Sequence, residues 1–162
     1  MTGVQTCALP ILVRKHRLAE RLLIDVIGLE WEAAHEEACR WEHVMSQKVE
    51  ERLVALLNEP MTDPYGNAIP GAGEASRGES VELAVRSREG EVLTLVRIEE
   101  PIQAQSDLIA AFDDAALRPG STLIVHAAGD YVRVSACDDA GTVTAEFQIP
   151  LSMTPHLFVE NV

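Results

Sequence analysis

The sequence predicts an α+β protein in which a helical domain is followed by a small β-barrel. Up to residue 59, apolar side chains recur at three- and four-residue intervals, as they do on the buried face of a helix. Beyond residue 80 they gather in short runs rich in β-branched residues, separated by Gly, Asp and Pro, as in the strands of a barrel. The 162 residues are enough for two small domains of this kind.

The first eleven residues, MTGVQTCALPI, differ from the rest of the chain. They contain no charged side chain and lack the basic start of a secretory signal. They resemble translated sequencing-adapter text more than protein. We therefore interpret residues 1–11 as a non-native segment, leave Cys7 out of the functional prediction, and expect the chain to be a fragment of a longer protein.

Three helices are expected in the helical domain, residues 12–59. The first covers residues 12–27, and Gly28 supplies its C-terminal stop. The second covers residues 31–45, where apolar residues recur without Gly or Pro. The third begins after Ser46, whose hydroxyl can cap a helix, and ends at Asn58.

Residues 60–80 are rich in Pro, Gly, Ser and Thr, a composition typical of a linker. The barrel domain is then expected over residues 81–162. Its predicted strands are the β-branched runs at 81–85, 92–98, 122–127, 131–136 and 143–149. One helix, residues 107–117 with Ser106 as its cap, interrupts these strands.

Composition narrows the class of protein. A hydrophobic content of 47% excludes a disordered chain. The formal net charge of −13 argues against nucleic-acid binding by this chain alone, because phosphate contacts are made by Lys and Arg. No apolar run reaches the roughly 18 residues of a membrane-spanning helix, so no membrane contact is expected. Three cysteines at irregular spacing favour a reducing cytoplasm.

Potential metal ligands gather on two of the predicted helices. Four of them share one face of the second helix, at positions i, i+4, i+7 and i+8: His35, Cys39, Glu42 and His43. On the first helix, His16 and Glu20 form an i, i+4 pair. Each residue alone could be an ordinary core or surface residue, but six in matched positions favour a site. Imidazole, thiolate and carboxylate together prefer iron, cobalt, nickel or zinc to magnesium or calcium.

A metalloenzyme could use the same side chains, with a glutamate as general base beside a metal-bound water. The helical zinc-protease motif His-Glu-x-x-His is absent, because Cys39 stands where that motif needs its second histidine. The sequence also lacks a GxSxG motif and a phosphate-binding glycine loop. We therefore expect no enzymatic activity, and a metalloenzyme or metal carrier stays the alternative.

The run RKHRLAERLLIDVIGLEWEAAHEEACRWEHVMS, residues 14–46, and the later DPYGNAIPG closely resemble the diphtheria toxin repressor family of iron-dependent regulators. The resemblance continues more loosely over residues 12–162. In that family a winged-helix domain binds operator DNA, a helical domain dimerises and binds metal, and an SH3-like barrel follows. The resemblance implies that only the last two domains are present here.

The resemblance also implies how the ligands are divided. The family's ancillary site corresponds to His16, Glu20 and His35, with Glu100 and Gln103 of an E-x-x-Q motif as barrel ligands. The family's primary site corresponds to three residues, Cys39, Glu42 and His43. Its remaining ligand, a Met near the DNA-binding domain, has no counterpart in this sequence.

An anion also binds at the ancillary site of the family, held by an Arg, a Ser and an Asn. Arg17 and Asn67 match two of these, but Asp63 stands where the Ser is expected. An additional carboxylate would repel an anion.

The function implied by the resemblance is the metal-sensing and dimerisation portion of an iron-dependent transcriptional repressor that controls metal homeostasis in the cytoplasm. Its expected metal is Fe²⁺, with Mn²⁺, Co²⁺, Ni²⁺ or Zn²⁺ as other candidates. Its expected partners are a second copy of the chain and, in the full-length protein only, operator DNA. A headless dimerisation module that pairs with complete repressors is a further alternative.

Overall fold

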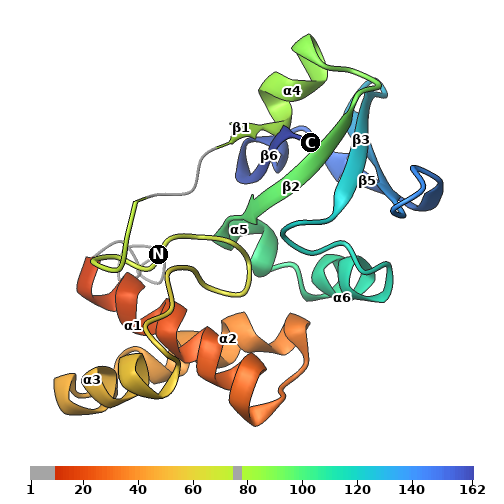
Figure 1. The fold of residues 1–162 in the computed structure, drawn as a ribbon. Helices are drawn as coiled ribbons and strands as arrows, with labels where there is room; N and C mark the ends of the chain where they lie inside the picture. The colour runs from red at the N-terminus through yellow and green to blue at the C-terminus, as the bar shows by residue number, and fades with distance from the viewer. Residues whose placement is uncertain (1–9, 75–77) are drawn as a thin grey trace. The chain divides into compact units, whose positions relative to one another are not determined.

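The computed structural model describes residues 10–74 and 78–162, which divide into two compact units (Figure 1). We call residues 1–75 the helical unit and residues 76–162 the sheet unit, and describe each by itself. Most of the segment interpreted as non-native, residues 1–9, lies outside the described residues, as do residues 75–77 of the expected linker. The order of helices and strands confirms the α+β class.

The helical unit contains four helical segments: α1 (Pro10–Arg21), the π-helix η2 (Leu22–Ile27), α2 (Trp31–Trp41) and α3 (Gln47–Leu56). The first predicted helix is therefore continued by a π-helical turn. Gly28 ends it in the left-handed region, at a φ of 77° that glycine adopts without a Cβ clash. Ser46 caps α3 as predicted, because its hydroxyl accepts a hydrogen bond from the Val49 N–H.

The second helix is shorter than the sequence predicts, since α2 ends at Trp41 and residues 42–44 form turns. Hydrogen bonding nevertheless continues through these turns, where the Met45 N–H donates to the Trp41 carbonyl at 3.0 Å. The Lys15 ammonium of α1 then donates to the Met45 carbonyl at 2.8 Å. The carbonyl of Met45, which follows the turns after α2, thus accepts a hydrogen bond from a side chain of α1.

The segment expected as a linker begins inside the helical unit. Its residues Tyr65 and Ile69 are fully buried. Two arginines of α1 hold it through its carbonyl oxygens, Arg14 at Pro70 (2.6 Å) and Arg21 at Thr62 (2.6 Å). The turn-rich composition suggested a linker, but these contacts place residues 61–74 with the helices, so the boundary comes later than expected.

The sheet unit is a six-stranded antiparallel sheet in the order β1-β6-β2-β3-β4-β5. Its strands are β1 (Glu79–Ser80), β2 (Val92–Ile98), β3 (Thr122–Ala127), β4 (Tyr131–Cys137), β5 (Val143–Pro150) and β6 (Leu157–Asn161). Its helices are α4 (Val81–Ser87), α5 (Glu100–Gln103), α6 (Ser106–Asp114) and the 3₁₀ turn η3 (Thr154–His156). The antiparallel sheet fits the small barrel that the sequence predicts.

One predicted strand is wrong, because residues 81–85 begin helix α4. Val81 and Ala84 are fully buried while Leu83 is exposed, and this spacing of buried residues is helical rather than alternating. The last strand, β6, was not predicted, although it pairs with both β1 and β2 in the sheet.

The core of the sheet unit is apolar. The alternate residues Leu93 and Leu95 of β2 and Val132 and Val134 of β4 point into it and are almost completely buried. Phe112 of α6 is also fully buried and meets a phenylalanine of β5 edge to face. No helix in residues 10–74 or 78–162 has the length and apolarity needed to cross a membrane.

Candidate metal centre

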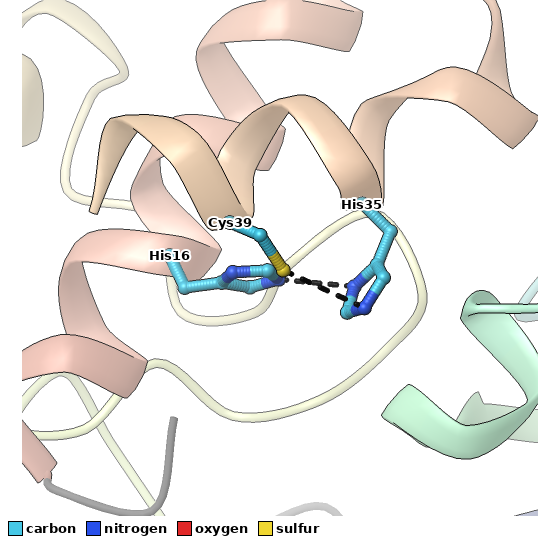
Figure 2. A group of neighbouring side chains, drawn as sticks. All are labelled: His16, His35 and Cys39. Atoms are coloured by element: carbon cyan, nitrogen blue, oxygen red, sulfur yellow. Dashed lines mark hydrogen bonds between the residues drawn. The ribbon is translucent and has the colours of Figure 1, made fainter. Parts of the chain in front are cut away.

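Helices α1 and α2 of the helical unit present potential metal ligands to each other. His16 and Glu20 lie one turn apart on α1, and His35 and Cys39 lie one turn apart on α2. Figure 2 shows the side chains of His16, His35 and Cys39 pointing toward one another. His16 and Glu20 are 3% and 0% exposed, so this polar group lies in the interior of the unit.

His16 is the centre of the cluster because both of its ring nitrogens have carboxylate partners. Its Nε2 lies 2.7 Å from Glu20 Oε1, and its Nδ1 lies 2.7 Å from Glu42 Oε2. The same Nε2 is 3.1 Å from His35 Nδ1, which in turn lies 3.3 Å from Glu20 Oε1. The imidazole of His16 therefore contacts Glu20 and His35 of the predicted ancillary set. It also contacts Glu42 of the predicted primary set.

The charges of this cluster depend on one another. Burial lowers the pKa of His16, but the negative charge of Glu20 and hydrogen bonds to Cys39 and Glu20 outweigh it and raise the pKa to about 11. Burial likewise lowers the pKa of His35, while its hydrogen bonds to Cys39 and Glu20 raise it to about 9. The two histidines in turn hold the pKa of buried Glu20 below its usual value. The surroundings of both imidazoles therefore favour their protonated forms when no metal is bound.

Cys39 completes the converging group. Its Sγ lies 3.8 Å from His35 Nε2, and one donor atom from each of His16, His35 and Cys39 falls within 4.8 Å of the others. Hydrogen bonds from His16 and His35 lower the pKa of the thiol to about 6. A thiolate is the form that binds metals, so this sulfur is prepared for coordination.

Glu42 and His43 lie just beyond α2 and do not belong to the converging group. Glu42 is buried, with one oxygen on His16 and the other 3.3 Å from His43 Nε2. The side chain of His43 is about half exposed. The predicted grouping of Cys39 with Glu42 and His43 stays a prediction.

A divalent cation fits the donors of the helical unit. Glu20 Oε2 is completely buried and has no hydrogen-bond partner among the described residues. Such an atom costs free energy unless something satisfies it, and a metal ion would do so. In the sheet unit, Gln103 Oε1 is also buried with no partner in the part of the chain that the structure describes, while its Nε2 donates to the Ile98 carbonyl at 2.7 Å. Glu100 and Gln103 open and close the short helix α5. Their role as metal ligands stays a prediction.

Arg17 and Asn67, the predicted anion ligands, both contact Asp63. Asp63 is 1% exposed, and its Oδ2 lies 3.0 Å from Asn67 Nδ2 and 3.6 Å from Arg17 Nε. Its Oδ1 accepts hydrogen bonds from the backbone N–H groups of Tyr65 and Asn67. Burial and the charge of Glu20 raise the pKa of Asp63 to about 8. Asp63 differs from the residue expected in the family, but its burial was not predicted from the sequence. The apolar residues Tyr65 and Ile69 near it could have indicated that burial.

Comparison with known proteins shows that this chain is similar to repressors. Residues 11–71 match the family described as "Iron dependent repressor, metal binding and dimerisation domain". The chain is 49% identical over 123 residues to the "Iron-dependent repressor IdeR" of Mycobacterium tuberculosis, covering 70% of this chain and 54% of that protein. It is 42% identical over 154 residues to the "Diphtheria toxin repressor" of Corynebacterium jeikeium, covering 83% of this chain and 64% of that protein. The chain thus spans about half the length of the mycobacterial relative.

Solved structures give the same result for the fold. A manganese-dependent transcriptional repressor in complex with manganese matches with a TM-score of 0.75 and 26% identity, over 94% of this chain and 70% of that chain. The structure of ScaR with bound Zn²⁺ matches with a TM-score of 0.71 and 27% identity, over 94% of this chain and 69% of that chain. The similarity therefore extends over both units and is not confined to the ligand-bearing helices.

Proposed function

Because this chain belongs to the iron-dependent repressor family, we propose that it is the metal-sensing and dimerising portion of a transcriptional repressor. The observation that carries the proposal is the buried cluster around His16, which joins two carboxylates, a second imidazole and a thiol between two packed helices. Such a group is expensive to bury unless its charges are compensated. Metal binding explains why it is there.

Replacement of protons by a metal ion explains how the cluster senses a metal. In the metal-free state the protons of His16 and His35 compensate the carboxylates of Glu20 and Glu42. A bound divalent ion would supply the compensating charge and allow ring nitrogens to lose protons. Binding therefore releases protons, and it stabilises the arrangement of α1 and α2 that presents the donors.

Iron as the physiological metal is part of the proposal. The donor set of imidazole, thiolate and carboxylate supports a transition metal over calcium or magnesium. The name of the mycobacterial relative, an iron-dependent repressor, supports iron within this group. Glu100 and Gln103 are proposed as further ligands, a role supported by the side-chain oxygen of Gln103, which has no hydrogen-bond partner among the described residues.

Dimerisation through the helical unit is supported by apolar side chains on its surface. Val49 and Leu56 of α3 are 49% and 63% exposed, and they are seven residues apart, so they lie on one face of the helix. Val44, just before α3, is 83% exposed. Contact with a second copy would remove such side chains from water. In the full-length protein, we propose, metal occupancy of this dimer controls binding to operator DNA.

The proposal is tested by calorimetric titration of the metal-free chain with Fe²⁺ under anaerobic conditions. We expect saturable binding with proton release, and an affinity for His35→Ala that is at least about tenfold lower. The matched control is His126→Ala, a histidine of the sheet unit paired only loosely with Glu89 at 3.8 Å. Equal titration curves for the wild type and His35→Ala would contradict the proposal.

A further inference from the structure

We propose that the side chain of Asp63 is a built-in anion, which fills the position that Arg17 and Asn67 would otherwise offer to a soluble oxyanion. The resemblance of the sequence predicts that these two residues hold an anion from solution. In the structure a carboxyl group of the chain itself contacts both of them. The inference does not depend on the proposed metal-sensing function.

Several N–H groups converge on the carboxyl group of Asp63. Its Oδ1 accepts hydrogen bonds from the backbone N–H groups of Tyr65 at 2.8 Å and Asn67 at 2.9 Å. Its Oδ2 lies 3.0 Å from Asn67 Nδ2 and 3.6 Å from Arg17 Nε. Backbone N–H groups of a tight turn and a guanidinium are groups that proteins use to bind anions. Both oxygens of Asp63 thus already have the partners that a bound anion would need.

The loop that carries Asp63 is folded tightly against α1. The Asp63 N–H donates to the Asn67 carbonyl at 2.8 Å, and Thr62 pairs with Ala68 in an antiparallel bridge. Arg17 Nη1 donates to the Ala68 carbonyl at 2.5 Å. Asp63 and Asn67 are consequently 1% and 2% exposed. A soluble anion would have to displace a side chain that its own backbone keeps at this position, and such a tethered group has a high effective concentration.

The charge around Asp63 also opposes a second anion. Burial and the negative charge of Glu20 raise the pKa of Asp63, whereas Arg17 and Asn67 lower it. A further anion beside these two carboxyl groups would be repelled by both. Under the proposed function, a cation bound at Glu20 would lessen this repulsion, so metal binding would need no anion from solution.

Rescue by formate tests the inference, because Asp63→Ala removes a carboxylate of the size of formate and leaves its N–H donors in place. The metal-free wild type and the variant are unfolded by heat at about pH 8.5, above the pKa of about 8 of Asp63, in sodium formate or sodium chloride of equal ionic strength. Tryptophan fluorescence follows the helical unit, since Trp31 and Trp41 lie on α2.

We expect formate to raise the midpoint of Asp63→Ala in a saturable way, by about 4 °C or more relative to chloride. The wild type should have the same midpoint in both salts, and sodium sulfate at equal ionic strength should give no saturable increase. Adding Arg17→Gln to Asp63→Ala should weaken the apparent affinity for formate at least about tenfold. The matched control is Glu50→Ala, which removes a carboxylate held by Arg14 at 2.6 Å in the same unit and should show no formate effect.

A wild type that formate or sulfate stabilises in a saturable way would have an open anion position, and the inference would be overturned. Circular dichroism checks each fold, and Asp63→Ser replaces Asp63→Ala if the latter does not fold. Formate that neither restores folding nor raises the midpoint in these variants would also overturn the inference. Both results would leave Fe²⁺ binding, and with it the proposed function, untouched.

Discussion

The two units of this chain differ in what they bury. Every acidic or basic side chain among the buried residues that the structure describes belongs to the helical unit: His16, Glu20, Glu42 and Asp63. The buried polar residues of the sheet unit are uncharged: Ser80, Gln103, Ser135 and Thr154. Because burying charge costs stability, the helical unit retains a cluster that a purely structural domain would not need. The difference supports the proposed placement of the sensor in the helical unit, while the sheet unit is stabilised by ordinary apolar packing.

The largest expected effect is a loss of stability in the sheet unit, with metal affinity unchanged. Phe112→Ala removes a fully buried ring that packs against Phe147 at a centroid distance of 4.8 Å. We expect a loss of about 3–5 kcal/mol in the unfolding free energy of the sheet unit, measured by urea denaturation. Calorimetry should show an unchanged affinity for metal. A comparable loss of metal affinity would mean that the two units are not separable in this way.

The second expected effect is a pH dependence confined to the helical unit. A group with a raised folded pKa contributes stability below its unfolded pKa and loses it as pH rises. His16 and His35, raised from 6.5 to about 11 and about 9, and Asp63, raised from 3.8 to about 8, all act in this sense above pH 6.5. Cys39, lowered from 9.0 to about 6, acts in the opposite sense over the same interval.

The three raised groups outnumber Cys39, so the metal-free helical unit should lose stability from pH 6.5 to pH 8. Each net proton corresponds to about 1.4 kcal/mol per pH unit. Urea denaturation followed by tryptophan fluorescence reports this unit, because Trp31 and Trp41, the only tryptophans of the chain, both lie on α2. A midpoint that stays constant or rises over this range would show that the histidines are not held as cations.

A smaller effect tests whether Glu42 contributes to the metal centre. Glu42→Gln keeps the shape of the side chain but weakens its hold on His16 Nδ1, and we expect metal affinity to fall about 10–100-fold. Glu99→Gln is the matched control, since Glu99 holds His156 Nδ1 at 3.0 Å in the sheet unit. Calorimetry on both variants checks the comparison. Equal affinity in Glu42→Gln and the wild type would exclude a contribution of Glu42 to metal binding.

Local sequence patterns predicted much of the fold. The strands at 92–98 and 122–127 have the predicted bounds, and the helical spacing that placed His16 beside Glu20 and His35 beside Cys39 is confirmed. The errors arose where short-range patterns are ambiguous. The β-branched residues of the run 81–85 suggested a strand, but this segment forms a helix. The strand β6, which pairs with β1 and β2, is short and was not predicted.

The site was predicted less completely than the fold. Spacing along a helix shows which side chains share a face, but it does not show which way each side chain turns. The structure alone shows that Glu42 reaches His16 and that the Cys39 donor atom converges with those of both His16 and His35. The burial of Asp63 against Arg17 depends on how residues 61–70 fold back onto α1. That contact is set by tertiary structure.

Hydrogen exchange with and without Fe²⁺ tests the central claim most directly, because it follows both units in one sample. Anaerobic addition of Fe²⁺ should slow amide exchange in α1 and α2, which carry the donors, and leave the central strands β3 and β4 unchanged. Slowed exchange in α5 as well would support Glu100 and Gln103 as ligands. Protection limited to the sheet unit, or absent from α1 and α2, would contradict the assignment of the sensor to the helical unit.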